Sequence, residues 1–348
     1  MTGPLPARQT AIWRATAAGE MTGRRGTCIL KRGERIEEMT PEESAMKIRI
    51  GVGFAGWPFE RTEDFWEFVD LVEESGLDSI WLNDRIHNPT PALEPITALA
   101  MIAGRTKRIK FGMSVAVLPV RDPLILAKEL ATIDFLSDGR MLPAFGLGVD
   151  SEAEWSAVGK TPRHRGAMTD EAVPLMRRLW SEDGVTHHGQ FYATHELTIL
   201  PKPRQQPMPV WFGGRSPAAY RRVARLGDGF LGSNQPPTDV AKAIGAIRQA
   251  ASEYQREVPA DHYGTIVPFH IGPDDVSTQT EALVRRVNPQ VSLKSYAAWP
   301  TPDAVLRCID AYVAVGVTKF VFRPLISGAA INDQFARLAQ VVVPRYQT

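Results

Sequence analysis

Short apolar runs alternate with longer amphipathic segments from residue 46 onward, and this pattern constrains the fold more than any other feature. Runs of strand length lie at about residues 48–54, 79–82, 110–117, 141–145, 210–212, 229–231, 263–271 and 319–322. Segments with the apolar spacing of helices follow at about 65–74, 94–103, 123–136, 169–180, 217–226, 240–254, 302–315 and 332–342. Strict alternation of this kind predicts a parallel sheet with helical crossovers.

Eight strand–helix pairs favour an α/β fold of the (β/α)8 TIM-barrel type with small insertions. The expected insertions are a short helix within 151–159 and a β excursion at 185–192. The competing fold is a doubly wound open sheet, which needs a glycine-rich turn after its first strand. Gly51-Val-Gly53 matches that turn poorly, and the richest glycine turns follow the fourth and fifth strands instead.

The first 45 residues differ from the rest, being rich in Arg, Glu, Thr and Gly without a sustained period. We expect residues 1–45 to be a mobile N-terminal extension, or to lie upstream of the true translational start. An ordered leader packed on the domain is the alternative. Residues 46–348 are expected to form a single barrel domain.

The net charge and the number of cysteines bear on which partners and which cellular compartment the sequence favours. The net charge of +1 gives no electrostatic case for binding nucleic acid or a membrane surface. Two cysteines, Cys28 and Cys308, fit a reducing cytoplasm rather than a disulfide framework. Neither a membrane span nor a secretory leader is expected from the apolar runs.

In a barrel, the functional residues lie on the loops that follow the strands. These loops contain polar residues and glycines, chiefly Asp84, Arg85, His87, Ser114, Gly146, Gly148, Gly213, Gly214, Arg215, Ser216 and Arg323. They contain neither a metal-binding motif such as HExxH nor a Gly-x-Ser-x-Gly elbow. We therefore expect no metal, and an organic cofactor that carries the chemistry.

The junction after the fifth strand has the features of an anion site. Gly213 and Gly214 permit a sharp turn, and Ser216 and Pro217 are typical of the N-cap and first position of a helix. Free N–H groups at such a helix start bind phosphate. Alternatively, the turn is only a well-capped helix start.

The run SVAVLPVRDPLILAKELATIDFLSDGR from Ser114 to Arg140, continuing into Phe145-Gly-Leu-Gly148, resembles the bacterial luciferase-like monooxygenase family. Arg163-His-Arg-Gly, Asp170-Glu171, Gly189-Gln-Phe-Tyr192, Pro201-Lys-Pro203 and the Gly-Gly-Arg-Ser-Pro turn continue the similarity, which covers about 48–343. The resemblance implies a (β/α)8 barrel, usually dimeric, that binds FMN or the deazaflavin coenzyme F420 at its C-terminal mouth.

The same resemblance implies the cofactor contacts. Ser216 and the amides of Gly214 and Arg215 would hold the phosphate, with Arg165 as a second anchor. A cis peptide would join Ser114 to Val115, behind the ring system of the cofactor. The remaining cofactor-binding positions would be Gly146, Gly148, Gly213 and Arg323.

The chain departs from deazaflavin relatives at two positions, with Arg85 after Asp84 where they have His, and Val149 where some sugar-phosphate dehydrogenases have Glu. Asp84 and His87 are candidates for proton transfer. Arg85 is either a partner for an anionic substrate or the reduced cofactor, or a solvated loop charge.

We therefore expect an oxidoreductase that uses reduced FMN and O2, or hydride transfer with F420, together with a separate flavin or F420 reductase. Apolar residues near the mouth (Phe54, Trp57, Leu118 and Trp155) suggest a small hydrophobic substrate. A flavin-binding barrel without catalysis is the alternative. A sugar-phosphate isomerase would place its phosphate site after strands seven and eight.

Overall fold

Ten parallel strands form one sheet, in the order β4-β6-β9-β10-β11-β12-β1-β2-β3-β5. The computed structural model describes residues 47–88, 90–149, 151–272 and 291–347, so the predicted extension at 1–45 lies outside the described residues. The strands are β1 (Arg49–Phe54), β2 (Ser79–Leu82), β3 (Lys110–Met113), β4 (Ala116–Val117), β5 (Met141–Leu142), β6 (Ala144–Gly146), β9 (Trp211–Gly213), β10 (Gly229–Ser233), β11 (Tyr263–Phe269) and β12 (Lys319–Pro324).

The sheet closes on itself, because β3 and β4 are two halves of one interrupted strand, and so are β5 and β6. β3 pairs with β5, with Gly112 opposite Leu142, and β4 pairs with β6, with Ala116 opposite Phe145. Pro143, which has no N–H to donate, separates β5 from β6. The ten strands therefore occupy eight positions around a barrel, which confirms the predicted fold class.

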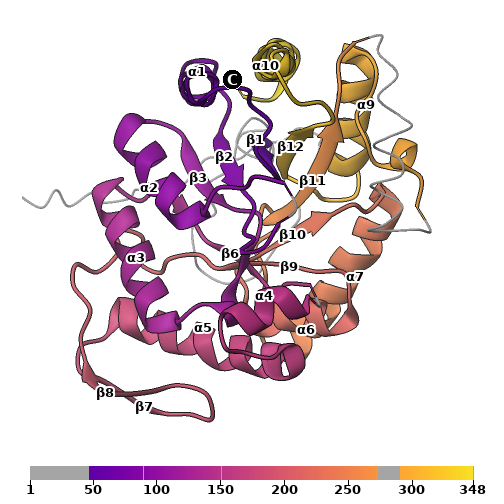
Figure 1. Ribbon diagram of the computed structural model, residues 1–348. Coiled ribbons are helices and arrows are strands. Elements are labelled where there is room, and N and C mark those ends of the chain that lie inside the picture. Colours follow the sequence, from indigo (N-terminus) through magenta and orange to yellow (C-terminus); the bar gives the residue numbers. More distant parts are fainter. Residues whose placement is uncertain (1–46, 89, 150, 273–290, 348) are drawn as a thin grey trace, which may run out of the picture. The chain divides into compact units, whose positions relative to one another are not determined.

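Helices surround the barrel (Figure 1). They are α1 (Thr62–Glu74), α2 (Pro95–Arg105), α3 (Pro123–Leu136), α4 (Glu152–Ala157), α5 (Arg165–Ser181), α6 (Pro217–Leu226), α7 (Pro237–Glu253), α9 (Pro302–Val313) and α10 (Ile331–Tyr346), with short 3-10 turns η1 (Leu118–Val120), η2 (Pro162–His164) and η3 (Leu293–Ser295). The bounds of α3 agree with the prediction, because Asp122 caps its start by accepting from Leu124 N and Ile125 N.

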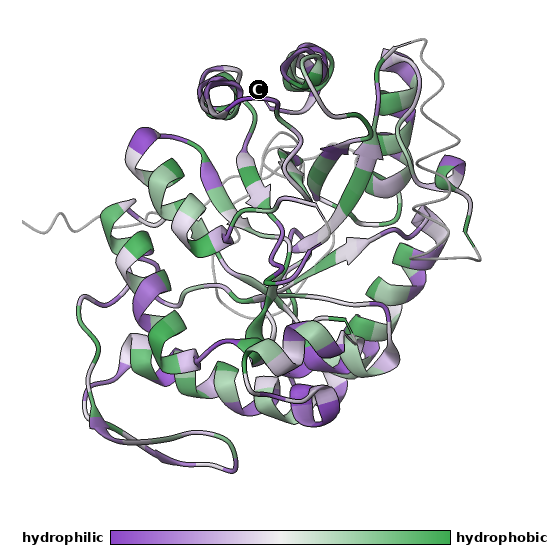
Figure 2. Ribbon diagram, in the orientation of Figure 1, coloured by the Kyte–Doolittle hydropathy of each residue, from purple (hydrophilic) through white to green (hydrophobic). Residues whose placement is uncertain are grey.

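The helices pack on the barrel through one apolar face each. In α10, Ile331, Phe335, Leu338 and Val342 are buried at helical spacing. Figure 2, in which α10 and α1 are seen nearly end-on, shows both hydrophobic and hydrophilic residues on each of them. A second cluster, Trp81, Ala144, Trp211, Leu231, Ile266 and Val321, comes from barrel strands alone and includes the large ring of Trp81. The barrel interior is therefore a packed core, and ligands have room only at its end.

The insertions are small. β7 (Val185–His188) and β8 (Ala193–Leu197) form an antiparallel hairpin, which confirms the expected β excursion. The hairpin projects from the rest of the fold in Figure 1. None of the helices in the described part of the chain is both long and apolar enough to cross a membrane.

Candidate functional site

A cavity of about 850 Å³ opens at the C-terminal end of the barrel. Every barrel position contributes to its lining, from Phe54 at the end of β1 to Arg323 near the end of β12. Of the predicted site residues, those that line it are Asp84, Arg85, Ser114, Val115, Gly146, Gly148, Arg165, Gly213, Gly214, Ser216 and Arg323. The other two predicted residues, His87 and Arg215, are exposed and lie outside the lining.

The turn between β9 and α6 and the first residue of α5 form what we call the anion pole of the cavity: Gly214, Ser216 and Arg165. The Ser216 hydroxyl accepts a hydrogen bond from Ala219 N at 3.2 Å, as predicted for an N-cap. Its own proton remains available to a ligand. Arg165 Nη1 is buried and has no hydrogen-bond partner among the described residues. An unpaired guanidinium nitrogen beside a helix N-terminus has the donors that a phosphate requires.

Gly214 has a backbone conformation that favours glycine, with φ of +135°. A Cβ at this position would lie 2.6 Å from Ala219 Cβ, in the first turn of α6. The glycine is therefore required for the close packing of the turn on the helix. The backbone stays accessible to a ligand because Gly214 and Ser216 are both exposed toward the cavity.

Arg222, which the sequence reasoning missed, adds a second guanidinium to the cavity lining. Its side chain is 8% exposed and donates from Nε to Asp170 Oδ1 at 2.6 Å. A Cβ on Gly166 would lie 3.1 Å from Arg222 Nη2, so Arg222 approaches the start of α5 next to Arg165. The sequence signal for Arg222 was Asp170, a carboxylate that is 29% exposed and pairs with it.

Val115 lies between two glycines that belong to different strands. A Cβ at Gly146 would come within 2.5 Å of Val115 Cγ2, and one at Gly213 within 3.1 Å of Val115 Cγ1. A Cβ at Gly148, where φ is +72°, would come within 2.6 Å of Val117 Cγ1. These glycines therefore accommodate valine side chains as well as any ligand. The peptide between Ser114 and Val115 is cis, as predicted.

Asp84 is buried and forms an ion pair with Arg121, whose Nε and Nη2 donate to its two oxygens at 3.0 and 2.7 Å. Val117 N donates to the same carboxylate at 2.9 Å. Burial lowers the pKa of the Arg121 guanidinium, but the hydrogen bonds and charges of Asp84 and Glu94 outweigh it and raise that pKa. The Asp84 carboxylate thus joins the loop after β2 to β4 and η1.

Arg85 pairs with a buried carboxylate rather than standing free in solvent. Its Nη2 lies 3.5 Å from Glu154 Oε2, and the side chain of Glu154 is 2% exposed. Ile86 N donates to Glu154 Oε1 at 2.8 Å. Glu154 lies on α4, so the predicted short insertion helix fixes the loop that carries Arg85.

The apolar part of the cavity differs from the predicted set. Phe54 and Trp57 line it as expected. Leu118 and Trp155 are buried outside the lining, so including them was wrong. The Trp155 indole N–H donates to Val149 O at 2.9 Å, and the ring is buried in a cluster with Val117 and Val120. The lining also contains apolar residues outside the predicted rim, among them Leu147, Pro324 and Leu325.

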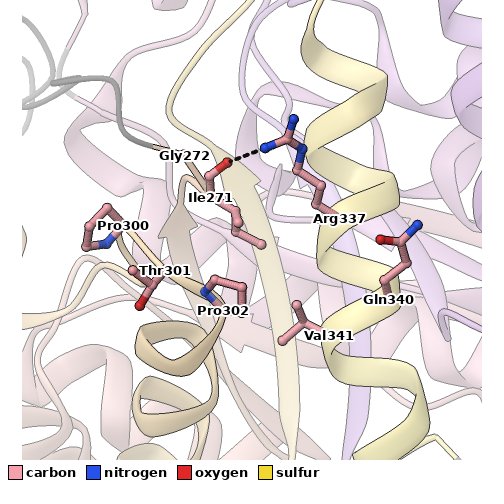
Figure 3. A pocket seen from close by; sticks show the side chains of 8 residues that line it. All are labelled: Ile271, Gly272, Pro300, Thr301, Pro302, Arg337, Gln340 and Val341. Carbon is pink, nitrogen blue, oxygen red and sulfur yellow. Dashed lines mark hydrogen bonds between the residues drawn. The ribbon is translucent and has the colours of Figure 1, made fainter.

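A second hollow, of about 590 Å³, contains none of the predicted site residues. It lies between the start of α9 and α10, and its lining consists of Ile271, Gly272, Pro300, Thr301, Pro302, Arg337, Gln340 and Val341 (Figure 3). Arg337 Nη1 donates weakly to Ile271 O at 3.4 Å. Across the described ranges, His, Cys, Asp and Glu nowhere gather in a group suited to a metal ion.

This chain is similar in sequence to dehydrogenases and in fold to a monooxygenase. F420-dependent glucose-6-phosphate dehydrogenase of Kineococcus radiotolerans is 34% identical over 173 residues, which are 47% of this chain and 50% of that protein. The Gordonia bronchialis enzyme of the same name is 26% identical over 80% of this chain and 92% of its own length. The crystal structure of a monooxygenase from Streptomyces bottropensis superposes with a TM-score of 0.73 at 24% identity, covering 86% of this chain and 100% of that one.

The profile that describes luciferase-like monooxygenases matches residues 43–303, which include the anion pole and all the barrel strands except β12. The match extends over most of the chain. This protein belongs to the luciferase-like monooxygenase family.

Proposed function

We propose that this protein is an oxidoreductase that binds coenzyme F420 or FMN in the cavity at the barrel mouth, with the cofactor phosphate at the anion pole. The observation that carries the proposal is Arg165 Nη1, a buried donor without a partner among the described residues, on a side chain that lines the same cavity as the N-terminus of α6. The names of both curated relatives, which are F420-dependent dehydrogenases, support the cofactor class.

The residues present fit such a cofactor. A volume of about 850 Å³ is within the range of cavities that bind organic ligands. Arg165 and Arg222 would neutralise a phosphate dianion, while Ser216 and the amides after Gly214 would donate hydrogen bonds to it. Val115, held between Gly146 and Gly213, would support one face of a planar ring.

When bound, either cofactor would supply two-electron chemistry that protein side chains lack. The chain itself would bind and orient the reactants and exclude water. Asp84 and His87 remain our candidates for moving a proton, and Arg85 for contacting an anionic group. Because Asp84 already accepts three hydrogen bonds, its role in proton transfer would require rearrangement of the Arg121 pair.

We propose a small hydrophobic organic substrate rather than a sugar phosphate. Phe54, Trp57, Leu147 and Leu325 give the cavity an apolar portion. Val149 also lines the cavity, with 49% of its surface exposed, and an aliphatic side chain there offers neither a proton nor a hydrogen bond. Because of this residue, we do not extend the substrate of the two dehydrogenases to this chain.

F420 is the first choice of cofactor because both curated relatives are named for it. FMN is the second choice, because the family resemblance of the sequence implies either cofactor. A separate flavin or F420 reductase would then supply the reduced cofactor. Anaerobic titration of the purified protein with each cofactor distinguishes the two, since the preferred cofactor should bind at least tenfold more tightly.

Turnover separates an enzyme from a flavin-binding barrel without catalysis. Reduced FMN or reduced F420 is mixed with the protein and a panel of hydrophobic aldehydes and ketones, oxidised F420 is mixed with the protein and hydrophobic alcohols, and the cofactor absorbance is followed with and without O2. An enzyme should reoxidise FMN, or reduce or oxidise F420, faster with one class of substrate than without substrate. A rate that no compound in the panel changes, despite tight cofactor binding, would favour the binding protein.

We also propose a cytoplasmic homodimer. Two neighbouring helices, α2 and α3, carry the exposed apolar side chains Met101, Ile125 and Leu136, of which Leu136 is 78% exposed. A face of this kind favours contact with another protein surface. Sedimentation of wild type and Ile125→Asp would test it, because the charge should shift a dimer toward monomer.

A further inference from the structure

Arg323 presents a positive charge to the cavity from the end of β12. Its Nη2 donates to both the backbone oxygen and the Oγ of Ser114, each at 2.7 Å. Its Nε is buried and has no hydrogen-bond partner in the described part of the chain. The guanidinium is therefore held across the barrel mouth by Ser114, while its Nε–H has no partner among the described residues.

No carboxylate in the described part of the chain forms a salt bridge with Arg323. Two other arginines of the cavity have one, since Arg85 pairs with Glu154 and Arg222 pairs with Asp170. Within the described ranges, Arg323 forms no salt bridge, and burial lowers the pKa of its guanidinium to about 10. A buried cation is costly unless negative charge is placed beside it. Because Arg323 lines the cavity, a bound ligand could place negative charge beside it.

A phosphate is not the expected partner of Arg323. The phosphate site proposed above has its own cations, Arg165 and Arg222, which come from α5 and α6. Arg323 instead contacts Ser114, next to Val115, where we place the ring of the cofactor. We therefore expect Arg165 and Arg323, which both line the cavity, to contact different parts of one ligand.

We propose that Arg323 binds the ring system of the cofactor and favours its reduced form over its oxidised form; this inference rests on the proposed function. A ring that accepts a hydride gains two electrons and one proton, so its charge becomes more negative by one unit unless a second proton follows. The organic donor that loses the hydride is oxidised by the same two electrons. A fixed cation beside the ring stabilises the state with more negative charge.

The test compares affinities for the oxidised and reduced forms of F420 and FMN, measured by anaerobic fluorescence titration, together with the midpoint potential of the bound cofactor. Arg323→Gln removes the charge, Arg323→Lys retains it, and Ser114→Ala removes one hydrogen-bond acceptor but leaves the charge. Arg165→Gln is the matched control, because it removes a cation from the anion pole, where the phosphate charge does not change on reduction.

We expect Arg323→Gln to weaken binding of the reduced form about tenfold more than that of the oxidised form. For a two-electron couple, this ratio lowers the midpoint potential by about 30 mV. Arg323→Lys and Ser114→Ala should keep most of the wild-type ratio. Arg165→Gln should weaken both forms by the same factor and leave the potential unchanged.

If Arg323→Gln loses the same affinity for both redox forms, or loses none, the inference is overturned but the proposed function is not. If wild type binds neither cofactor, the proposed function fails and the inference fails with it. Circular dichroism of the apo-protein checks the fold of each variant, and Arg323→Met replaces Arg323→Gln if the latter does not fold. Failure of both neutral variants to fold would assign Arg323 a structural role and also overturn the inference.

Discussion

Asp170 Oδ1 accepts a hydrogen bond from Arg222 Nε at 2.6 Å, and this contact fixes a second guanidinium in the cavity, next to Arg165. The other oxygen of Asp170 lies 2.7 Å from Arg225 Nη2, whose side chain is 45% exposed. One carboxylate therefore positions one buried arginine of the site and one surface arginine outside it.

Removing Arg222 should weaken cofactor binding. Charge-assisted hydrogen bonds are worth roughly 1.5–3 kcal/mol, so Arg222→Gln should raise the Kd by about one to two orders of magnitude. Arg225→Gln is the matched control, since it removes the exposed partner of the same carboxylate, and its Kd should stay within about twofold of wild type. Fluorescence titration gives both values. Equal losses in the two variants would show that Arg222 does not contact the ligand.

Gly214→Ala should destabilise the apo-protein by about 1–3 kcal/mol, because the left-handed backbone is strained for alanine. The new methyl group would also lie 2.6 Å from Ala219 Cβ. Gly245→Ala is the control, because Gly245 lies inside α7 with nothing within 4 Å of the added Cβ. That change should stabilise the protein by about 0.5–1 kcal/mol. Urea unfolding measures both; a Gly214→Ala variant as stable as wild type would contradict the account of this turn.

Glu171 should stabilise the β7–β8 hairpin in a pH-dependent way. Its carboxylate accepts from the backbone N–H groups of Tyr192, Phe191 and Gln190 at 2.8 to 3.1 Å. Burial raises the pKa of Glu171, but these donors and His187 outweigh burial, so the pKa lies below its usual value of 4.5. A carboxyl group with a lowered pKa contributes stability above its unfolded pKa, and this contribution is lost as the pH falls through the folded pKa.

Glu171→Gln should therefore reduce the free energy of unfolding by about 1–3 kcal/mol at neutral pH. The difference from wild type should shrink below pH 4.5 and vanish under more acidic conditions. Glu196→Gln, an exposed carboxylate on the same hairpin, should change little at any pH. Urea titrations at several pH values test this, and a difference that does not depend on pH would refute the electrostatic explanation.

Asp84→Asn should destabilise the protein strongly, because it leaves the Arg121 guanidinium with a weakened partner. Breaking a buried ion pair costs about 3–5 kcal/mol, and the Asp84 side chain is 2% exposed. Arg121→Met should cost a similar amount. The double variant should cost less than the sum of the two, because neither residue is then left as an unpaired charge. Additive losses in chemical unfolding would mean that the pair contributes no coupling.

The sequence predicted the barrel because strand and helix periods are local properties. The start of α6 was predicted correctly, since Ser216 and Pro217 occupy adjacent capping positions. The interruption between β5 and β6 was not expected, although Pro143 was visible in the sequence. A single proline is compatible with an edge strand or with a bulge, and only the neighbouring strands with which it pairs decide between the two.

The candidate site was predicted less completely, because long-range contacts have no local period. Asp84 was selected for its position after a strand, but its environment depends on Arg121, which lies 37 residues further along the chain. Trp155 was predicted to belong to the apolar rim of the mouth, whereas its indole N–H donates to Val149 O and the ring is buried. Arg222 was not among the predicted site residues, and its pairing with Asp170 spans 52 residues.

The most direct test of the central claim is a titration of wild type and Arg165→Ala with F420, FMN and riboflavin, which lacks the phosphate. We expect wild type to bind F420 or FMN at least tenfold more tightly than riboflavin, at about 1.4 kcal/mol per factor of ten. Arg165→Ala should lose one to two orders of magnitude of affinity for the phosphorylated cofactor and little for riboflavin. If riboflavin binds wild type as tightly as FMN and F420 does not bind, the anion pole does not hold a cofactor phosphate, and the proposed function is contradicted.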